Sequence, residues 1–336
     1  MPSSCGRVGM SVALLTLASG ISQFALAQAS LEKTTVAYRK VNGHEILADV
    51  YRPKGNSVRP VIVFIHGGSL INGNRAGGIN PPSMLSFAEQ NGYAVVSIDY
   101  RLAPETKLPA IISDIEAAFT WLGGDGATRF HFDPERMVVV GGSAGGYLTL
   151  VAGYRVHPKP KALVSLFGYG ELNAEWYTKP SPYSYYNTPQ ISENEAMQQT
   201  DGTVISDGNR RKGDGSKIVR YYRQNGLTPQ AVSGFNPESL ASEIAPYEPV
   251  KNVTRDYPPT LLIHGTVDTG VPFEESEKMA EQFREHGVPY ILLPIEKGAH
   301  GLEGGNEAQI EDAYKTMREF ITKYLGATLR GSHEEQ

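Results

Sequence analysis

The chain has 336 residues and a formal net charge of −5, with 40% hydrophobic and 20% charged residues. This ordinary globular composition excludes a fully disordered or fibrous protein. The acidic balance lacks the basic excess that nucleic-acid binders carry, so no nucleic-acid partner is expected.

The first 27 residues are predicted to be a signal peptide. One charge, Arg7, precedes an apolar run from Val12 to Ala18, and Ala25-Leu26-Ala27 fits the small-residue cleavage rule. A buried helix or a membrane anchor is the alternative, but polar residues interrupt the run, and a span needs about 20 mostly apolar residues. We expect a secreted or periplasmic protein without a stable membrane anchor, beginning at Gln28. The single cysteine, Cys5, lies in this segment, so the mature chain has no disulfide.

Eight strands are predicted in the rest of the chain. Residues 34–40 and 44–52 alternate apolar and polar side chains around a turn at 41–43, which predicts an antiparallel hairpin. The other six candidates are unbroken apolar runs, which are typical of strands buried on both faces. These runs are residues 60–65, 93–98, 136–140, 162–167, 260–263 and 290–294.

Helices are predicted between these strands, because apolar residues recur at three- and four-residue spacing. The predicted helices are residues 83–90, 110–122, 144–154, 273–286 and 308–324. An antiparallel start followed by alternating strands and helices predicts an α/β fold, with an eight-stranded, mostly parallel sheet and helices on both faces.

The segment from about residue 170 to 250 breaks this pattern. It is rich in Tyr, Pro, Ser, Gly and Asn, and only residues 216–224 form a clear helical pattern. We interpret it as an insertion after the sixth strand that acts as a lid or pocket wall, since long irregular segments in compact domains are often functional. A surface excursion without a role is the alternative.

The candidate nucleophile is Ser143. It lies in Gly141-Gly142-Ser143-Ala144-Gly145-Gly146, directly after the strand at 136–140 and at the start of the helix at 144–154. That is the context of the GxSxG nucleophile elbow, in which a tight turn exposes the serine at the start of a helix. An ordinary glycine-rich turn is the alternative.

A serine nucleophile needs a base, and the base needs a carboxylate to orient it. His300 lies in a loop just after the last predicted strand, and Asp268 lies in a loop just after the strand at 260–263. We therefore predict His300 as base and Asp268 as acid. The other histidines after Ser143 occupy less suitable places, and three rival aspartates fall in the insertion. These residues are His157, His264, His286 and His333, and Asp201, Asp207 and Asp214.

A further loop is predicted to stabilise the negative oxygen of an acyl-transfer transition state. His66-Gly67-Gly68-Ser69 follows the strand at 60–65, and glycines let backbone N–H groups approach that oxygen. The N–H of Ala144, the residue after the nucleophile, is the expected further donor. His66 precedes the serine, so we predict a structural role for it.

Three motifs resemble those of the α/β-hydrolase superfamily, in the carboxylesterase and lipase branch related to hormone-sensitive lipase. They are HGGS at 66–69, DYRLAPE at 99–105 and GGSAGG at 141–146, where family members often have HGGG, DYRLAPE and GDSAGG. The resemblance implies an α/β-hydrolase catalytic domain over residues 28–336. It places the triad at Ser143, Asp268 and His300. It also implies oxyanion donors at Gly68, Ser69 and Ala144, with Gly67 as a further candidate.

The chain departs from that branch in two motif positions. Ser69 replaces the last glycine of HGGG, and Gly142 replaces the aspartate of GDSAGG. The N-terminal cap of the branch is not expected here, so the insertion is expected to build the pocket. In this respect the chain is similar to smaller secreted acetyl and feruloyl esterases.

These observations predict a serine carboxylesterase that acts on small or medium carboxylic esters, without a cofactor or metal. Tyr169, Trp176 and Tyr177 are candidate substrate-binding residues, because aromatic walls with polar tips suit rings and sugars. Packing of the insertion onto the sheet is the alternative role for these aromatics. Two other functions stay open: a serine peptidase resembling the prolyl-oligopeptidase family, and a non-catalytic hydrolase-fold binding protein.

Overall fold

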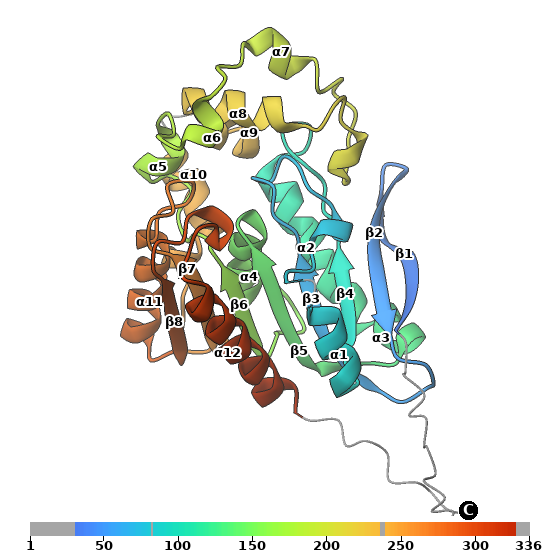
Figure 1. Ribbon diagram of the computed structural model, residues 1–336. Coiled ribbons are helices and arrows are strands. Elements are labelled where there is room, and N and C mark those ends of the chain that lie inside the picture. Colours follow the sequence, from blue (N-terminus) through green and yellow to red (C-terminus); the bar gives the residue numbers. More distant parts are fainter. Residues whose placement is uncertain (1–30, 82, 236–238, 327–336) are drawn as a thin grey trace, which may run out of the picture.

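The computed structural model describes residues 31–81, 83–235 and 239–326. The predicted signal peptide and Cys5 lie outside the described residues. Within these ranges, no helix combines the length and the apolar character needed to cross a membrane. Figure 1 shows a central sheet flanked by helices, with a group of short helices above one edge.

One sheet of eight strands has the order β1-β2-β4-β3-β5-β6-β7-β8. β2 pairs antiparallel with β1 and β4, whereas the other neighbouring strands are parallel. The eight predicted strands are confirmed, although β5 begins well before the apolar run at 136–140. The strands are β1 (Glu32–Val41), β2 (His44–Arg52), β3 (Arg59–Ile65), β4 (Ala94–Ile98), β5 (Phe132–Gly142), β6 (Ala162–Leu166), β7 (Thr260–Gly265) and β8 (Tyr290–Ile295).

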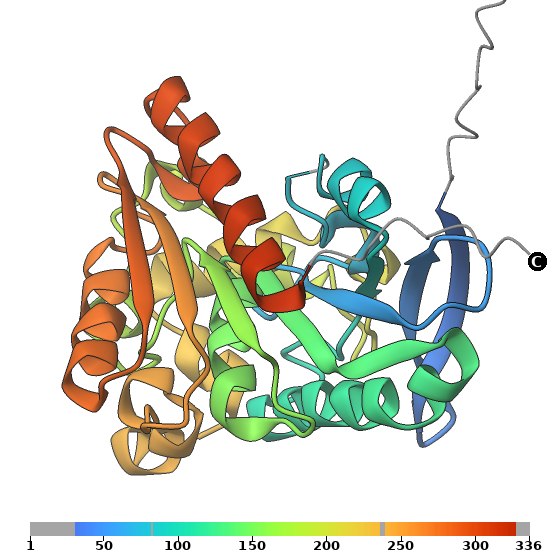
Figure 2. The same cartoon turned by 90° about the horizontal axis from the view of Figure 1, so that it is seen from below.

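Helices cover both faces of the sheet, as Figure 2 shows from below. α1 (Met84–Asn91) and α12 (Glu307–Leu325) pack on one face with the side chains of Ile62 and Phe64. α2 (Leu108–Gly123), α4 (Ala144–Arg155) and α11 (Glu274–His286) pack on the other face with Val61, Val63 and Ile65. Successive residues of β3 thus point to opposite faces, which is why the buried strand is apolar throughout. The five helices predicted between strands are confirmed, and α3 (Asp125–Phe130) is an additional short helix.

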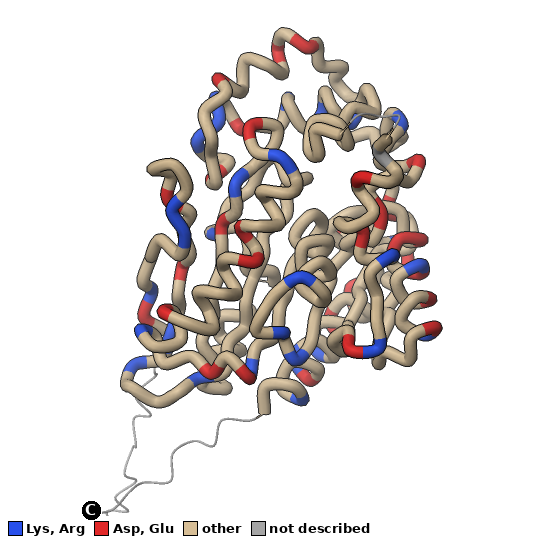
Figure 3. The backbone as a smooth tube through the Cα atoms, turned by 180° about the vertical axis from the view of Figure 1, so that it is seen from behind, with Lys and Arg blue, Asp and Glu red and all other residues tan. Residues whose placement is uncertain are grey.

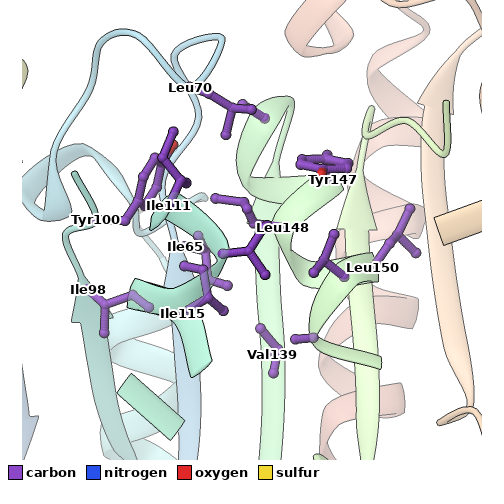
Figure 4. Packing of buried hydrophobic residues seen from close by; sticks show 14 of the residues in the cluster. Ile65, Leu70, Ile98, Tyr100, Ile111, Ile115, Val139, Tyr147, Leu148 and Leu150 are labelled. Carbon is purple, nitrogen blue, oxygen red and sulfur yellow. The ribbon is translucent and has the colours of Figure 1, made fainter. Parts of the chain in front are cut away.

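The helix α4 is the most deeply packed helix of the fold. Tyr147, Leu148 and Leu150 are buried on it, and Leu148 lies between α2 and the strands β3 and β5 (Figure 4). Burying each such side chain contributes about 1.5–3 kcal/mol. The turn from β5 into α4 is therefore held on a rigid support.

The chain between β6 and β7 folds into short helices above the ends of the parallel strands (Figure 1). The helix predicted at 216–224 is confirmed as α8, and the other helices of this insertion were not predicted. The helices are α5 (Glu175–Thr178), α6 (Ser184–Asn187), α7 (Glu193–Met197), α8 (Ser216–Asn225), α9 (Thr228–Ser233) and α10 (Leu240–Ile244). In Figure 3, Lys and Arg residues are interspersed with Asp and Glu residues along the backbone, including that of the insertion.

A buried ion pair attaches the insertion to the sheet. Arg211 and Glu105 have side chains that are only 1% and 3% exposed, and two nitrogens of Arg211 contact both carboxylate oxygens of Glu105 at 2.8 and 3.0 Å. The same guanidinium donates to the carbonyls of Ile71 and Ala103. Thr200 adds a hydroxyl hydrogen bond to Glu105. These contacts join the insertion to the loops after β3 and β4.

Replacing Arg211 by methionine is expected to lower the free energy of unfolding by about 3–5 kcal/mol, because it leaves the Glu105 carboxylate buried without a counter-charge. A urea titration followed by circular dichroism measures this change. Arg210→Met, at the exposed neighbouring position, is the control and should change stability by less than about 0.5 kcal/mol. Equal stability of the two variants would contradict the anchoring role of Arg211.

Candidate active site

Ser143 lies at the tight turn between β5 and α4. Its backbone has φ 56° and ψ −122°, a conformation that a non-glycine residue keeps only where the surrounding structure holds it. Its N–H donates to the carbonyl of Leu166 at 2.9 Å. A Cβ on Gly145 would lie 2.1 Å from the carbonyl oxygen of Ile65, so only glycine fits two residues after the serine. The predicted strand, turn and helix around Ser143 are thus present.

His300 lies between Ser143 and Asp268. Its Nε2 is 3.0 Å from Oγ of Ser143, and its Nδ1 is 2.7 Å from Oδ2 of Asp268. The three residues follow β5, β7 and β8, so three strands bring them to one edge of the sheet. If the proton is assigned to Nδ1, the ring donates to Asp268 and Nε2 can accept the serine proton.

The three rival aspartates are held elsewhere, in the insertion. Asp201 and Asp207 accept the backbone N–H groups of Thr203 and Asn209, and Asp214 accepts that of Ser216. The geometry therefore selects Asp268 as the acid nearest to His300. The chemical roles of the triad stay predictions at this point.

Asp268 is fixed by four neighbouring groups. Its Oδ1 accepts the N–H groups of Gly270 and Val271 at 2.8 and 2.9 Å, and its Oδ2 lies 2.7 Å from His300 and 3.4 Å from His264. Burial alone would raise the pKa of Asp268, but the hydrogen bonds to His264 and His300 outweigh it and hold the pKa well below its usual range. Asp268 is therefore a carboxylate at neutral pH.

His264 is a supporting residue whose role the sequence did not indicate. It is fully buried at the end of β7, with Nδ1 2.7 Å from the Ser276 hydroxyl and Nε2 2.9 Å from the Val271 carbonyl. These contacts fix the imidazole beside Asp268. In the sequence, only the spacing of four residues between His264 and Asp268 could have indicated this contact. Such a spacing brings side chains together on a helix, but not where a strand continues into a loop.

The loop after β3 lies against the nucleophile. A Cβ on Gly67 would be 3.3 Å from Cβ of Ser143, and Gly68, Ser69 and Leu70 all have positive φ, of 108°, 59° and 62°. The N–H groups of Gly68 and Ser69 find no acceptor among the described residues. The N–H of Ala144, at the start of α4, likewise has no acceptor in the described part of the chain. The position agrees with that of an oxyanion hole, whose function stays a prediction.

His66 is placed as expected for a structural residue. It is 2% exposed, its ring stacks on Tyr100 at 4.2 Å, and its Nδ1 lies 2.8 Å from the Gly67 carbonyl. Burial lowers the pKa of His66 to about 4, so its ring is neutral at physiological pH. Among the described parts of the chain, no group of three His, Cys, Asp or Glu side chains is arranged to hold a metal ion.

The three aromatic residues predicted to bind substrate lie together. The ring of Tyr169 stacks on Tyr147 at 5.0 Å and meets the rings of Trp176 and Tyr177 at 5.2 and 5.9 Å. Tyr169 and Tyr177 are buried, and Trp176 is half-buried. Through Tyr147, they pack the start of the insertion onto helix α4. A role for them in substrate binding stays a prediction.

Other aromatic residues lie closer to the triad. Phe167, directly after β6, meets the ring of His300 edge-on at 5.2 Å. Tyr183 contacts Gly270, beside His300, and Tyr186 interacts with the side chain of Ser69. The position of Phe167 at the carboxyl end of a parallel strand was a usable sequence signal, whereas the tyrosines depend on the fold of the insertion.

Two family models match the chain in separate stretches. The BD-FAE model matches residues 48–181, which contain Ser143 and the loop after β3. The prolyl oligopeptidase family model matches residues 217–328, which contain Asp268 and His300.

The curated relatives include an esterase and several fungal synthases. Esterase LipC of Mycobacterium tuberculosis is 27% identical over 267 residues, covering 76% of this chain and 57% of LipC. The non-reducing polyketide synthase atr1 of Stereocaulon alpinum is 28% identical over 353 residues, covering 93% of this chain. This chain spans 14% of the length of that synthase.

Solved structures share the fold. An α/β-hydrolase superfamily protein from Enterococcus faecalis matches with a TM-score of 0.65 and 20% identity, covering 87% of this chain and 99% of that one. The predicted α/β-hydrolase fold, with an eight-stranded and mostly parallel sheet, is therefore confirmed.

Proposed function

We propose that this chain is an esterase-type α/β-hydrolase, like the proteins that it resembles, and that it cleaves small or medium carboxylic esters with Ser143 as its nucleophile. One observation carries the proposal: an unbroken hydrogen-bonded row runs from Ser143 through His300 to Asp268. Such a row turns a weakly nucleophilic hydroxyl into an attacking group without a cofactor. The enzyme is expected to be exported, with a mature chain that begins at Gln28.

The first half of the reaction forms an acyl-enzyme. Oγ of Ser143 attacks the ester carbonyl carbon while its proton moves to Nε2 of His300. The Asp268 carboxylate holds the ring and stabilises the imidazolium that forms. The C–O bond to the alcohol then breaks, and His300 returns the proton to the leaving alkoxide oxygen.

The second half releases the acid. Water attacks the acyl carbon and gives a proton to His300, and the bond to Oγ breaks as Ser143 regains a proton. In both halves, the N–H groups of Gly68, Ser69 and Ala144, with Gly67 as a further candidate, would stabilise the negative carbonyl oxygen. Removing one such donor typically costs 10²–10³-fold in kcat.

A serine peptidase is the second candidate, because the prolyl oligopeptidase family model covers residues 217–328. Against it, Ala144 follows the serine where that family usually has a bulky aromatic. Purified enzyme should be compared on p-nitrophenyl butyrate and on glycyl-prolyl p-nitroanilide. We expect kcat/KM to be orders of magnitude higher on the ester. A higher value on the anilide would establish the peptidase, and no turnover of either would favour the non-catalytic binding protein.

The acyl group is expected to be short or aromatic. The insertion supplies tyrosines and a tryptophan rather than the broad aliphatic groove that long chains need. Among acetyl, butyryl, octanoyl and palmitoyl esters of one alcohol, kcat/KM should peak at acetyl or butyryl, and palmitoyl should fall at least about tenfold below the peak. A maximum at octanoyl or longer would contradict this preference.

Trp176→Ala tests whether the aromatic residues contact substrate. We expect it to change the ratio of kcat/KM between butyryl and feruloyl esters, because a flat indole wall contacts the two acyl groups differently. Tyr185→Ala, at a position that is 49% exposed, is the control and should leave the ratio unchanged. An unchanged ratio in Trp176→Ala would contradict a substrate contact of Trp176 and would support a packing role only.

A further inference from the structure

Arg223 of α8 is a buried cation with too few hydrogen-bond acceptors. Its side chain is 3% exposed. Its Nη2 donates to the Gly270 carbonyl at 3.0 Å and to the Ser181 hydroxyl at 3.3 Å. Nε is buried and finds no acceptor among the described residues. Nη1 makes no hydrogen bond to these residues either, but it is not a fully buried atom. Three of the five N–H groups that a guanidinium carries are therefore unused.

The charge of Arg223 also has no acidic partner in the described chain. Buried arginines normally pair with a carboxylate, as Arg211 does with Glu105. The guanidinium of Arg223 is instead surrounded by the rings of Trp176, Tyr177 and Tyr186, whose centroids lie 5.1, 5.7 and 5.1 Å from its central carbon. Ring faces attract the cation, but they leave its N–H groups without strong acceptors.

A second unused donor lies in the same group. Nε1 of Trp176 is buried without an acceptor. The unmet groups of Arg223 and Trp176 are donors, and the hydroxyls of Tyr169 and Tyr177, also buried without a partner, can donate as well. A ligand that offers only acceptors, with a negative charge, would match them, and an ionised carboxylate is such a group.

The place of Arg223 connects it to the triad. Gly270, whose carbonyl accepts from Arg223, donates its own N–H to Asp268, and a Cβ on it would lie 3.3 Å from Cγ of His300. Tyr186, against one side of the guanidinium, interacts with Ser69 of the loop beside the nucleophile. Arg223 is therefore connected to Asp268 of the triad through Gly270. It is connected to the predicted oxyanion loop through the ring of Tyr186.

We propose that Arg223 binds a carboxylate carried by the ester substrate, so that the substrates are esters with an anionic group a few bonds from the scissile carbonyl. The proposal rests on the proposed esterase function. The guanidinium supplies charge-assisted hydrogen bonds, and the aromatic rings around it exclude water and strengthen them. A neutral ester of the same shape leaves the three N–H groups unused.

Matched ester pairs test this proposal in a pH-stat at neutral pH. Monomethyl succinate and methyl 4-methylpentanoate differ by a carboxylate against an isopropyl group on the acyl side. Acetoxyacetate and isobutyl acetate make the same change on the alcohol side. The readout is the ratio of kcat/KM between the anionic and the neutral member of each pair, because any general damage to the enzyme affects both members.

We expect the wild-type ratio to exceed 1 for one pair, which identifies the side of the ester that carries the anion. Arg223→Met, which keeps the length of the stem, should lower that ratio at least tenfold, and Arg223→Lys should keep part of it. Arg220→Met removes a partly exposed cation of the same helix that stacks on Tyr185, and it should leave the ratio unchanged.

Two results would overturn the proposal. One is an equal decrease of kcat/KM for the anionic and the neutral ester in Arg223→Met. That result would show that Arg223 only positions the Gly270 carbonyl and does not bind the substrate. The other is a wild-type ratio of 1 or less for both pairs, which needs no variant and so holds even if Arg223→Met does not fold. Wild-type enzyme that hydrolyses none of the four esters would instead contradict the esterase function itself.

Discussion

Replacing Ser143 by alanine is expected to lower kcat on p-nitrophenyl butyrate by a factor on the order of 10⁶, close to the uncatalysed rate. The hydroxyl oxygen is the atom that forms the acyl-enzyme, and within the described parts of the chain no other hydroxyl is hydrogen-bonded to His300. Triad members act as a unit, so the remaining His300 and Asp268 should contribute little alone. Initial rates with purified enzyme, corrected for the blank, measure the effect.

The chain offers a matched control for this substitution. The hydroxyl of Ser206 lies 3.1 Å from Nε2 of His44, another serine–histidine pair, and no carboxylate of the described residues is hydrogen-bonded to that ring. Ser206→Ala should retain kcat within about threefold of wild type, because that pair lies outside the proposed site. A Ser143→Ala enzyme that keeps more than about 1% of wild-type kcat would contradict the assignment of the nucleophile.

Replacing Asp268 by asparagine is expected to lower kcat by a factor on the order of 10⁴, with a much smaller change in KM. The Asp268 carboxylate accepts the N–H of Nδ1, which leaves Nε2 of His300 free to take the serine proton. An amide NH₂ facing Nδ1 favours the opposite tautomer, in which Nε2 carries a proton and cannot act as a base. Steady-state kinetics on p-nitrophenyl butyrate separate the effect on kcat from that on KM.

Asp214→Asn is the control for this substitution, because Asp214 is an exposed aspartate of the insertion that bonds the backbone of Ser216. It should leave kcat essentially unchanged. A loss in Asp214→Asn comparable to that in Asp268→Asn would show that the acid was wrongly chosen. A loss confined to KM in Asp268→Asn would also contradict the role of Asp268.

The sheet could be predicted because each buried strand corresponds to a continuous apolar segment of the sequence. Residues 60–65 form such a run, and they lie in β3 (Arg59–Ile65), where both faces are covered by helices. The start of β5 at Phe132 was missed, because Asp133, Pro134 and Glu135 interrupt the apolar pattern. Strand pairing, rather than side-chain pattern, defines that part of the element.

The positions of Ser143, Asp268 and His300 could be predicted because each follows a recognisable strand, and parallel strands end at one edge of the sheet. Their distances could not be predicted, and neither could the supporting role of His264. That role depends on which way a fully buried side chain at the end of β7 points, and this follows from packing against Ser276 of α11.

The insertion was the part least accessible from sequence. Helices of four residues, such as α5 and α6, are too short to show periodicity, and they persist through tertiary contacts rather than propensity. The contact between Glu105 and Arg211 joins residues 106 positions apart. The unmet donors of Arg223 become visible only when its neighbours in space are known.

Covalent labelling with a fluorophosphonate tests the central claim most directly, because the reagent reacts with an activated serine and stops at the covalent adduct. Intact-mass analysis of the wild-type enzyme should show one added phosphonyl group, and peptide mapping should place it on the peptide that contains Ser143. Ser143→Ala should gain no mass under the same conditions, whereas Ser206→Ala should label as wild type does. An adduct on any other residue, or a labelled Ser143→Ala enzyme, would contradict Ser143 as the nucleophile.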